Sequence, residues 1–276
     1  RSPMQDGRKL TESKNGSGKS GISLSPEELP GEDCPYKVVF DQVGMAYNEG
    51  GDEAISDVNL KVKRGETIGV IGGTGSGKSA LVNLIPRFYE PTKGEIRIDG
   101  IPVGKLKLAD LRKNIGLATQ DVLLYSDTIE GNIAYGDSTI DLDEAMKFAK
   151  YSAASDFISK MPEGYGERGV GLSGGQKQRI SLARALAVKP SILILDDTTS
   201  AVDMETEKQI QQSLRELDFP CTKIIIAQRI STTKAADKIL VLQDGYIREA
   251  GTHEELLAKK GYYYELVKLQ TGAEEL

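Results

Sequence analysis

The sequence predicts an α/β fold that combines a mostly parallel sheet with an antiparallel β layer and a helical subdomain. Three short continuous apolar runs, Thr67–Ile71, Ser191–Leu195 and Lys223–Ala227, suit buried strands of a parallel sheet that is covered by helices on both faces. Two earlier segments, 37–43 and 58–63, alternate apolar and polar residues as half-solvated strands do. Strands of both kinds, separated by helical patterns, indicate the α/β class.

Helical periodicity is clearest in the middle of the chain. It runs over residues 141–160 and again over 175–188, where Ile180, Ala183 and Ala187 share one face. We therefore expect a helical subdomain at about 121–180, inserted between strands of the sheet.

The chain divides into a linker at 1–35, a folded domain at 36–271 and a short C-terminal tail at 272–276. The linker is rich in Ser, Gly, Lys, Glu and Pro and lacks apolar periodicity, so we expect it to be flexible. Its segment 16–20 resembles a phosphate-binding loop, but Ser13 stands where the first glycine belongs and no apolar strand precedes it. The start at Arg1 instead of Met suggests a fragment or a processed form.

Composition and charge narrow the function classes. Of the 276 residues, 39% are hydrophobic and 28% are charged, and no apolar run approaches the ~20 residues of a membrane span, so we expect a soluble chain. The net charge of −6 argues against a nucleic-acid partner, since duplex-binding domains usually carry a basic face. Cys34 and Cys221 show neither metal-ligand nor disulfide spacing, which fits a reducing cytosolic setting.

The strongest motif is a G-x-x-x-x-G-K-S phosphate loop between an apolar strand and a helix. Its glycines let backbone N–H groups converge on phosphate oxygens, and the helix N-terminus adds a favourable dipole. We predict that Lys78 reaches the β- and γ-phosphates and that the Ser79 hydroxyl ligates Mg²⁺. The residues that we assign to this ATP site are Gly72, Gly73, Thr74, Gly75, Ser76, Gly77, Lys78, Ser79 and Ala80.

A carboxylate at the end of a neighbouring buried strand is the second part expected of such a metal site. Asp196 ends the apolar run 192–196, and we predict that it meets Mg²⁺ through water. An acidic residue in this place could instead cap the next helix.

A second anion-binding motif identifies the family. Leu172, Ser173, Gly174, Gly175 and Gln176 form an LSGGQ segment that opens a helix, and Asp196 follows after a buried strand. This order resembles the ATP-binding cassette (ABC) transporter family over residues 37 to about 271, with a P-loop core of the RecA-like type. The resemblance implies ATPase activity with ATP and Mg²⁺, and two domains that close head-to-tail so that this signature grips ATP held by the opposite subunit.

The resemblance also assigns single residues. Tyr47 is similar to the aromatic residue that stacks on adenine, although a half-buried strand tyrosine is the plain alternative. Gln120 resembles the glutamine that ligates Mg²⁺ and senses the membrane domain, and a polar loop residue is again the alternative. Ser200, Ala201 and Asp203 match the loop that contacts the partner across the interface.

Two residues depart from the family pattern at catalytic positions. Asp197 stands where a catalytic Glu usually follows the metal aspartate, and Gln228 stands where a His usually follows the next strand. Because Asp is one methylene shorter, we expect slow hydrolysis at this chain's own site, although backbone adjustment could keep Asp197 competent. This combination resembles the degenerate half of a heterodimeric bacterial exporter.

The implied partners are a transmembrane domain of the same parent polypeptide and a second, non-identical ABC subunit, at the cytoplasmic face of the cell membrane. A soluble ABC-type regulator is the alternative, but such proteins usually carry two cassettes. A DNA-repair ATPase would insert a long coiled coil into the helical region, where sustained heptads are lacking.

Overall fold

The computed structural model describes residues 10–13, 21–24 and 34–272, and the chain divides into two compact units. The first unit contains residues 1–112 and 222–276, and the second contains residues 113–221. The α/β class that the sequence predicts is confirmed, because each unit combines helices with parallel strands.

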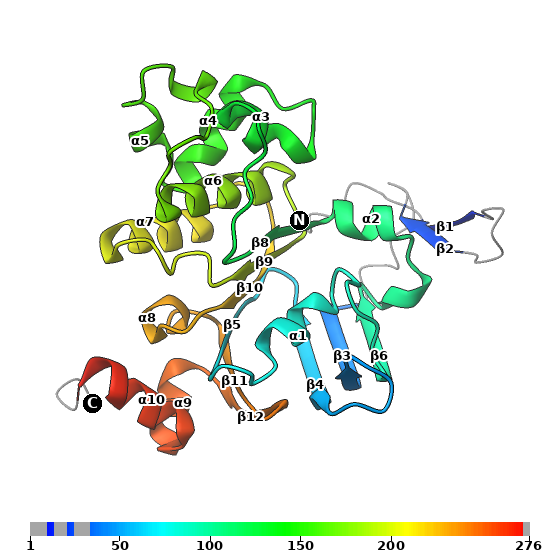
Figure 1. Cartoon of the computed structure of the whole chain (residues 1–276). Helices are drawn as coiled ribbons and strands as arrows, with labels where there is room; N and C mark the ends of the chain where they lie inside the picture. Colours follow the sequence, from blue (N-terminus) through cyan, green and yellow to red (C-terminus); the bar gives the residue numbers. More distant parts are fainter. Residues whose placement is uncertain (1–9, 14–20, 25–33, 273–276) are drawn as a thin grey trace. The chain divides into compact units, whose positions relative to one another are not determined.

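An antiparallel sheet of the first unit forms from the alternating segments. Phe40 of β3 is paired with Leu60 of β4 on one side and with Ile96 of β6 on the other, and all three side chains are buried. Figure 1 shows these strands side by side. The sheet runs in the order β4-β3-β6-β7, with β3 at Tyr36–Ala46, β4 at Glu53–Lys63, β6 at Lys93–Ile98 and β7 at Ile101–Pro102.

The continuous apolar runs of the first unit form parallel strands, as predicted. β5 (Thr67–Gly72) lies between β10 (Thr222–Ile226) and β11 (Lys238–Gln243) and is parallel to both. The outer strand β12 (Tyr246–Gly251) is antiparallel to β11. Buried β5 ends at the phosphate loop, which places the motif at the carboxyl end of a central strand, where α/β folds usually bind ligands.

Short helices accompany these strands. A buried cluster joins Tyr263 and Val267 of α10 to Ile71 of β5 and Ile230 of α8, so the C-terminal helix packs on the core beside the loop strand. The helices are α1 (Lys78–Asn83), η1 (Val103–Lys105), α2 (Leu108–Lys113), α8 (Ile230–Thr233), α9 (His253–Lys259) and α10 (Tyr262–Thr271).

The second unit is mostly helical around one parallel pair, β8 (Ile115–Ala118) and β9 (Ile192–Asp196). The predicted helix at 141–160 is divided into two, because Ala153 has a left-handed backbone (φ 55°) that ends the first helix. The helices are α3 (Ile129–Ile133), η2 (Ala134–Gly136), α4 (Leu142–Tyr151), α5 (Ser155–Ile158), η3 (Gly164–Gly166), α6 (Gly174–Ala187) and α7 (Met204–Arg215).

Part of the predicted linker carries regular structure. Strands β1 (Leu10–Ser13) and β2 (Gly21–Leu24) pair antiparallel where the sequence predicts none. Most of the remaining linker, the glycine-rich segment 16–20 and most of the predicted tail lie outside the described residues. Within the described ranges, no helix is both long enough and apolar enough to cross a membrane.

Candidate functional site

The phosphate loop fits closely against β4. Gly77 has a backbone φ of 102°, in the region that favours glycine. A Cβ atom at Gly77 would lie 2.6 Å from the carbonyl oxygen of Ala54 and 2.8 Å from Cγ2 of Ile55. The last glycine of the motif is therefore required both by its conformation and by the neighbouring strand.

Backbone hydrogen bonds hold the loop from outside as well. The N–H of Gly245, in the turn between β11 and β12, donates to the carbonyl of Ser76 at 3.1 Å. The carbonyl of Gly245 in turn accepts from the N–H of Ser56 in β4 at 2.9 Å. The turn at Gly245 thus links the phosphate loop to β4.

The side chain of Lys78 folds back over the loop that precedes it. Its ammonium donates to the carbonyls of Gly72 and Gly73, each at 2.8 Å. A cation held at the centre of a glycine-rich curve is suited to charge-assisted hydrogen bonds with phosphate oxygens.

Tyr47 follows β3 in the same unit and is 52% exposed. Its ring meets the ring of Tyr89 edge to face, with 5.1 Å between the centroids. Partial burial raises the pKa of Tyr47, and the electrostatic effect of Tyr89 raises it further. An exposed ring that a second ring holds in place can offer one face to a planar base. The sequence predicted Tyr47 for this role but not its supporting partner Tyr89.

Gln228, the other predicted residue in this unit, lies between β10 and α8. Its backbone carbonyl accepts a hydrogen bond from Nε2 of Gln270 at 2.8 Å. Gln270 had no predicted role.

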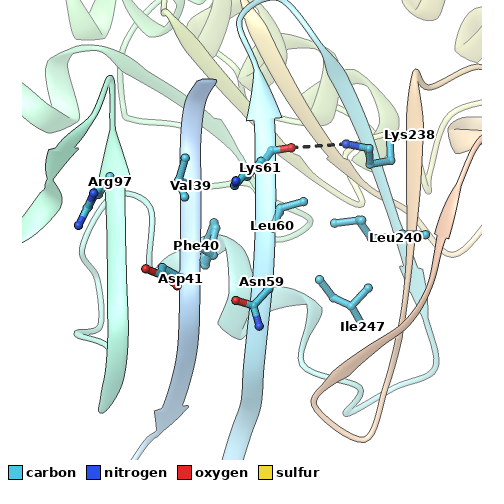
Figure 2. Close-up of a pocket in the computed structure, with 11 residues that line it drawn as sticks. Val39, Phe40, Asp41, Asn59, Leu60, Lys61, Arg97, Lys238, Leu240 and Ile247 are labelled. Carbon is cyan, nitrogen blue, oxygen red and sulfur yellow. Dashed lines mark hydrogen bonds between the residues drawn. The ribbon is translucent and has the colours of Figure 1, made fainter. Parts of the chain in front are cut away.

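A separate groove of about 610 Å³ lies beside β4 in this unit (Figure 2). Two of its three cations have carboxylate partners: Arg97 lies 2.5 Å from Glu95, and Lys238 lies 3.3 Å from Glu66 and reaches the carbonyl of Lys61. The ammonium of Lys61 lies over the ring of Tyr36, 5.4 Å from its centroid. The groove also has no glycine-rich turn among its lining residues. It does not compete with the phosphate loop as the anion site.

The acidic positions of the second unit lie at the end of β9. Asp196 is the last residue of the strand, and Asp197 has a left-handed backbone with φ 52°. Asp and Asn adopt this conformation more readily than other side chains with a Cβ. The carbonyl of Asp197 accepts from the N–H of Ser200 at 3.3 Å, so the chain turns sharply into the predicted interface loop.

The LSGGQ segment begins α6 through a capping box. The Ser173 hydroxyl accepts from the N–H of Gln176 at 3.2 Å, while the Gln176 side chain accepts from the N–H of Ser173 at 2.9 Å. Leu172 is buried beneath this turn. Gly174 and Gly175 stand in the first turn, where helix N–H groups lack partners within the helix, so the segment presents a surface suited to anions.

The signature rests on the predicted interface loop. A Cβ atom at Gly175 would lie 2.6 Å from the carbonyl oxygen of Ala201. Buried Gln178 joins the same two segments: its amide nitrogen donates to the Ser200 hydroxyl and its oxygen accepts from the N–H of Ala201, both at 3.1 Å. No role was predicted for Gln178 from the sequence. Its position, as a polar residue in a helix that is largely buried, was the one sign that it has a structural role.

Asp203, the last predicted interface residue, caps α7. Its carboxylate accepts from the N–H of Thr206 at 2.9 Å and from the Thr206 hydroxyl at 2.7 Å. These hydrogen bonds hold the pKa of Asp203 below its usual value. The side chain thus shapes the end of the interface loop.

Gln120 is exposed and lies just after β8. The segment that follows it is held by hydrogen bonds of buried Asn132. Asn132 donates to the carbonyl of Tyr125 at 3.1 Å and accepts from Arg184 at 2.7 Å. Arg184 lies over the ring of Tyr125, which stacks on Tyr135 with 3.8 Å between the centroids. Sequence reasoning missed this cluster, because its members are far apart along the chain.

The predicted site residues are therefore distributed over both units. Tyr47, the phosphate loop and Gln228 belong to the first unit, and the second contains Gln120, Asp196, Asp197, the signature and the interface loop. Among the described residues, no group of three or more His, Cys, Asp or Glu side chains could hold a metal.

His253, the first residue of α9, is partly buried. Its Nδ1 lies 2.7 Å from the hydroxyl of fully buried Tyr263, and burial raises the pKa of Tyr263 to about 12. The contact between His253 and Tyr263 connects α9 to α10.

Comparison with known proteins assigns the family. The ABC transporter family model matches residues 55–200. A Staphylococcus aureus (strain NCTC 8325 / PS 47) protein, "Putative multidrug export ATP-binding/permease protein", is 45% identical over 91% of this chain, and the match spans 44% of that protein. The Bacillus subtilis (strain 168) "Uncharacterized ABC transporter ATP-binding protein YknU" is 47% identical over 90% of this chain and 43% of its own length. The chain thus spans less than half of these relatives.

A solved structure, a bacterial Atm1-family ABC exporter with ATP bound, matches 86% of this chain and 42% of its own with a TM-score of 0.81 and 39% identity. Family model, relatives and structure agree on the family. The chain belongs to the ABC transporter family.

Proposed function

We propose that this chain is the ATP-binding and ATP-hydrolysing motor domain of an exporter. The observation that carries the proposal is the presence in one chain of two turns whose geometry suits anions, the loop around Lys78 and the capped turn at Ser173. The relatives support export, since one is named for multidrug export and the matched structure is an exporter. The fused permease part in the first name favours a transporter over a soluble regulator.

ATP would be held by the loop and by Tyr47, with Mg²⁺ as its cofactor. Mg²⁺ prefers oxygen ligands and is usually held by one or two carboxylates, several waters and substrate phosphates. The Ser79 hydroxyl, the Gln120 amide oxygen and the Asp196 carboxylate supply this kind of donor set. When bound, the metal neutralises charge on the phosphates, and Lys78 adds a positive charge from the loop.

The chain would work as half of a head-to-tail dimer, in which each signature completes the other subunit's ATP site. The packing of Gly175 on Ala201 supports this arrangement, because it joins the signature to the loop proposed to touch the partner. A helix N-terminus with a serine cap can donate N–H groups to the γ-phosphate of a nucleotide bound elsewhere.

This chain's own ATP site would hydrolyse slowly. Asp197 places its carboxylate one methylene closer to the backbone than Glu does, and Gln228 cannot carry the charge of a His. A positioned base contributes ~10²–10⁴ in rate, or roughly 3–5 kcal/mol of barrier. The second subunit would then be a non-identical chain that brings the hydrolytic residues to the site completed by this chain's signature.

The membrane partner would be a transmembrane domain of the same parent polypeptide, which places the chain at the cytoplasmic face of the membrane. The described surface offers a contact for it: Leu123, whose carbonyl accepts from Arg184, is 73% exposed, and Tyr135, which stacks on Tyr125, is 59% exposed. Exposed large side chains of this kind often mark protein contact surfaces.

Two substitutions in a reconstituted full-length pair test the proposal. Ser173→Arg places a bulky cation where the partner's γ-phosphate docks, and we expect it to lower total ATP turnover by more than roughly 100-fold. Asp197→Ala removes a residue of the slow site, and we expect a loss of less than about threefold. Ser159→Arg, at an exposed serine of the same unit, controls for the added charge. Equal losses for Ser173→Arg and Asp197→Ala would refute the asymmetric arrangement.

A further inference from the structure

The C-terminal helix reaches back to the segment that carries Gln228. Gln270 lies in the last turn of α10, and its side-chain amide makes two hydrogen bonds with the backbone at 228–230. Its oxygen accepts from the N–H of Ile230 and its nitrogen donates to the carbonyl of Gln228, each at 2.8 Å. The side chain of Gln270 thus bonds to the carbonyl before Arg229 and to the N–H after it.

The first turn of α8 needs such a partner. Ile230 is the first residue of α8, and the first N–H groups of a helix have no acceptor within it. The residue at the cap position, Arg229, makes no side-chain capping hydrogen bond. Gln270 supplies the missing acceptor from a distant part of the chain, so the position of α10 determines where this turn begins.

Helix α10 is itself fixed at its other end. The carboxylate of Glu249 accepts from the N–H groups of Tyr262 and Tyr263, at 2.6 and 3.2 Å. The ring of Tyr263 is fully buried and its hydroxyl meets His253. With Val267 also in the core, Gln270 projects from a helix that has little freedom to shift.

We propose that Gln270 is a positioning residue for Gln228: it holds the backbone of 228–230 and so sets how the Gln228 side chain meets the γ-phosphate. This inference rests on the proposed role of Gln228 in the ATP site. It assigns the C-terminal helix a part in distinguishing ATP from ADP, because only ATP carries the phosphate that Gln228 would contact.

The first test measures the clamp itself. Hydrogen exchange of the Ile230 amide in the 276-residue chain should become at least roughly fivefold faster in Gln270→Ala, the effect of losing about one hydrogen bond. Leu269→Ala changes an adjacent side chain that is 82% exposed and should leave this exchange rate unchanged. Unchanged exchange in Gln270→Ala would overturn the inference.

The second test measures the coupling to nucleotide. We expect titration calorimetry with Mg²⁺ to show that Gln270→Ala reduces the preference for ATP over ADP by roughly fivefold. Gln228→Ala should reduce it at least as much, and adding Gln270→Ala to Gln228→Ala should have no further effect, since both act through one side chain.

The outcomes separate the two proposals. If Gln228→Ala lowers the ATP preference and Gln270→Ala does not, the positioning role is wrong while the site stands. An additive loss in the double variant would also refute it, because Gln270 would then act by another route. If Gln228→Ala leaves the preference unchanged, the assigned role of Gln228 fails, and the inference fails with it.

Discussion

The phosphate loop and the signature are both turns that lead into a helix, yet they are built differently. In the loop, Lys78 lies across the curve and a distant turn at Gly245 holds the backbone in place. The signature Leu172–Gln176 contains no cation, and its turn is fixed by its own capping box and by Ala201. A loop that contains a cation can bind phosphate without help from another subunit. We expect a turn that offers only N–H groups to strengthen the binding of a phosphate that another site already holds. The comparison predicts that substitutions in the loop affect nucleotide binding in the isolated chain, and that those in the signature act only in the pair.

The largest expected effect is at Lys78. We predict that Lys78→Ala weakens ATP binding to the isolated chain by about 3 kcal/mol or more, roughly 100-fold, because it removes the charge held at the loop carbonyls. Titration calorimetry measures the affinity, and thermal unfolding checks that the loop survives. Lys160→Ala, at an exposed lysine of the second unit, is the matched control. An unchanged affinity in Lys78→Ala would show that this loop is not the nucleotide site.

An intermediate effect is expected at Gly175. The new Cβ of Gly175→Ala would meet the carbonyl of Ala201 at 2.6 Å, so the signature and the interface loop must separate. Overpacking of this kind costs about 2 kcal/mol, and we expect turnover of the reconstituted pair to fall roughly 30-fold. ATP affinity of the isolated chain should stay within about twofold of the unsubstituted chain. A comparable loss of affinity in the isolated chain would remove the distinction between the two turns.

The smallest effect is expected at Tyr47. Removing the exposed ring in Tyr47→Ala should weaken ATP by about 1 kcal/mol, at the lower end of base–aromatic stacking, because Tyr47 is 52% exposed and its ring already has an aromatic partner in Tyr89. Inorganic triphosphate, which has no base, should bind equally to both forms in the same titration. Tyr246→Ala, at another exposed tyrosine of this unit, serves as the control. A matching loss for inorganic triphosphate would contradict stacking.

Sequence patterns predicted five strands, at 37–43, 58–63, 67–71, 191–195 and 223–227, and the helix at 175–188, because these elements depend on neighbouring residues. They gave no range for β6, β7, β11 or β12. Periodicity failed where one residue changes the backbone locally: Ala153 divides the helix predicted at 141–160. Strands β1 and β2 were missed because a polar, glycine-containing segment shows little alternation.

The motifs gave the candidate site, but not the residues that hold it. Gln178, Asn132 and Gln270 act through amide groups that bond to backbone or side chains far away in sequence. An amide side chain can serve many partners, and its spacing within a helix does not reveal which partner it meets. Only the fold brings such pairs together, so these supporting residues lay beyond prediction from sequence.

The contact between Gly175 and Ala201 also bears on communication between the two ATP sites of the proposed dimer. Asp196, proposed for this chain's own metal site, leads through the turn at Asp197 directly into the loop on which the signature rests. In the proposed dimer, we expect a shift at one site to reach, along this short segment, the turn that would serve the other. Allosteric coupling of this kind is reciprocal: if ATP in the slow site tightens the partner's site, ATP in the partner's site must tighten the slow one equally. A site that seldom hydrolyses can then still regulate its neighbour.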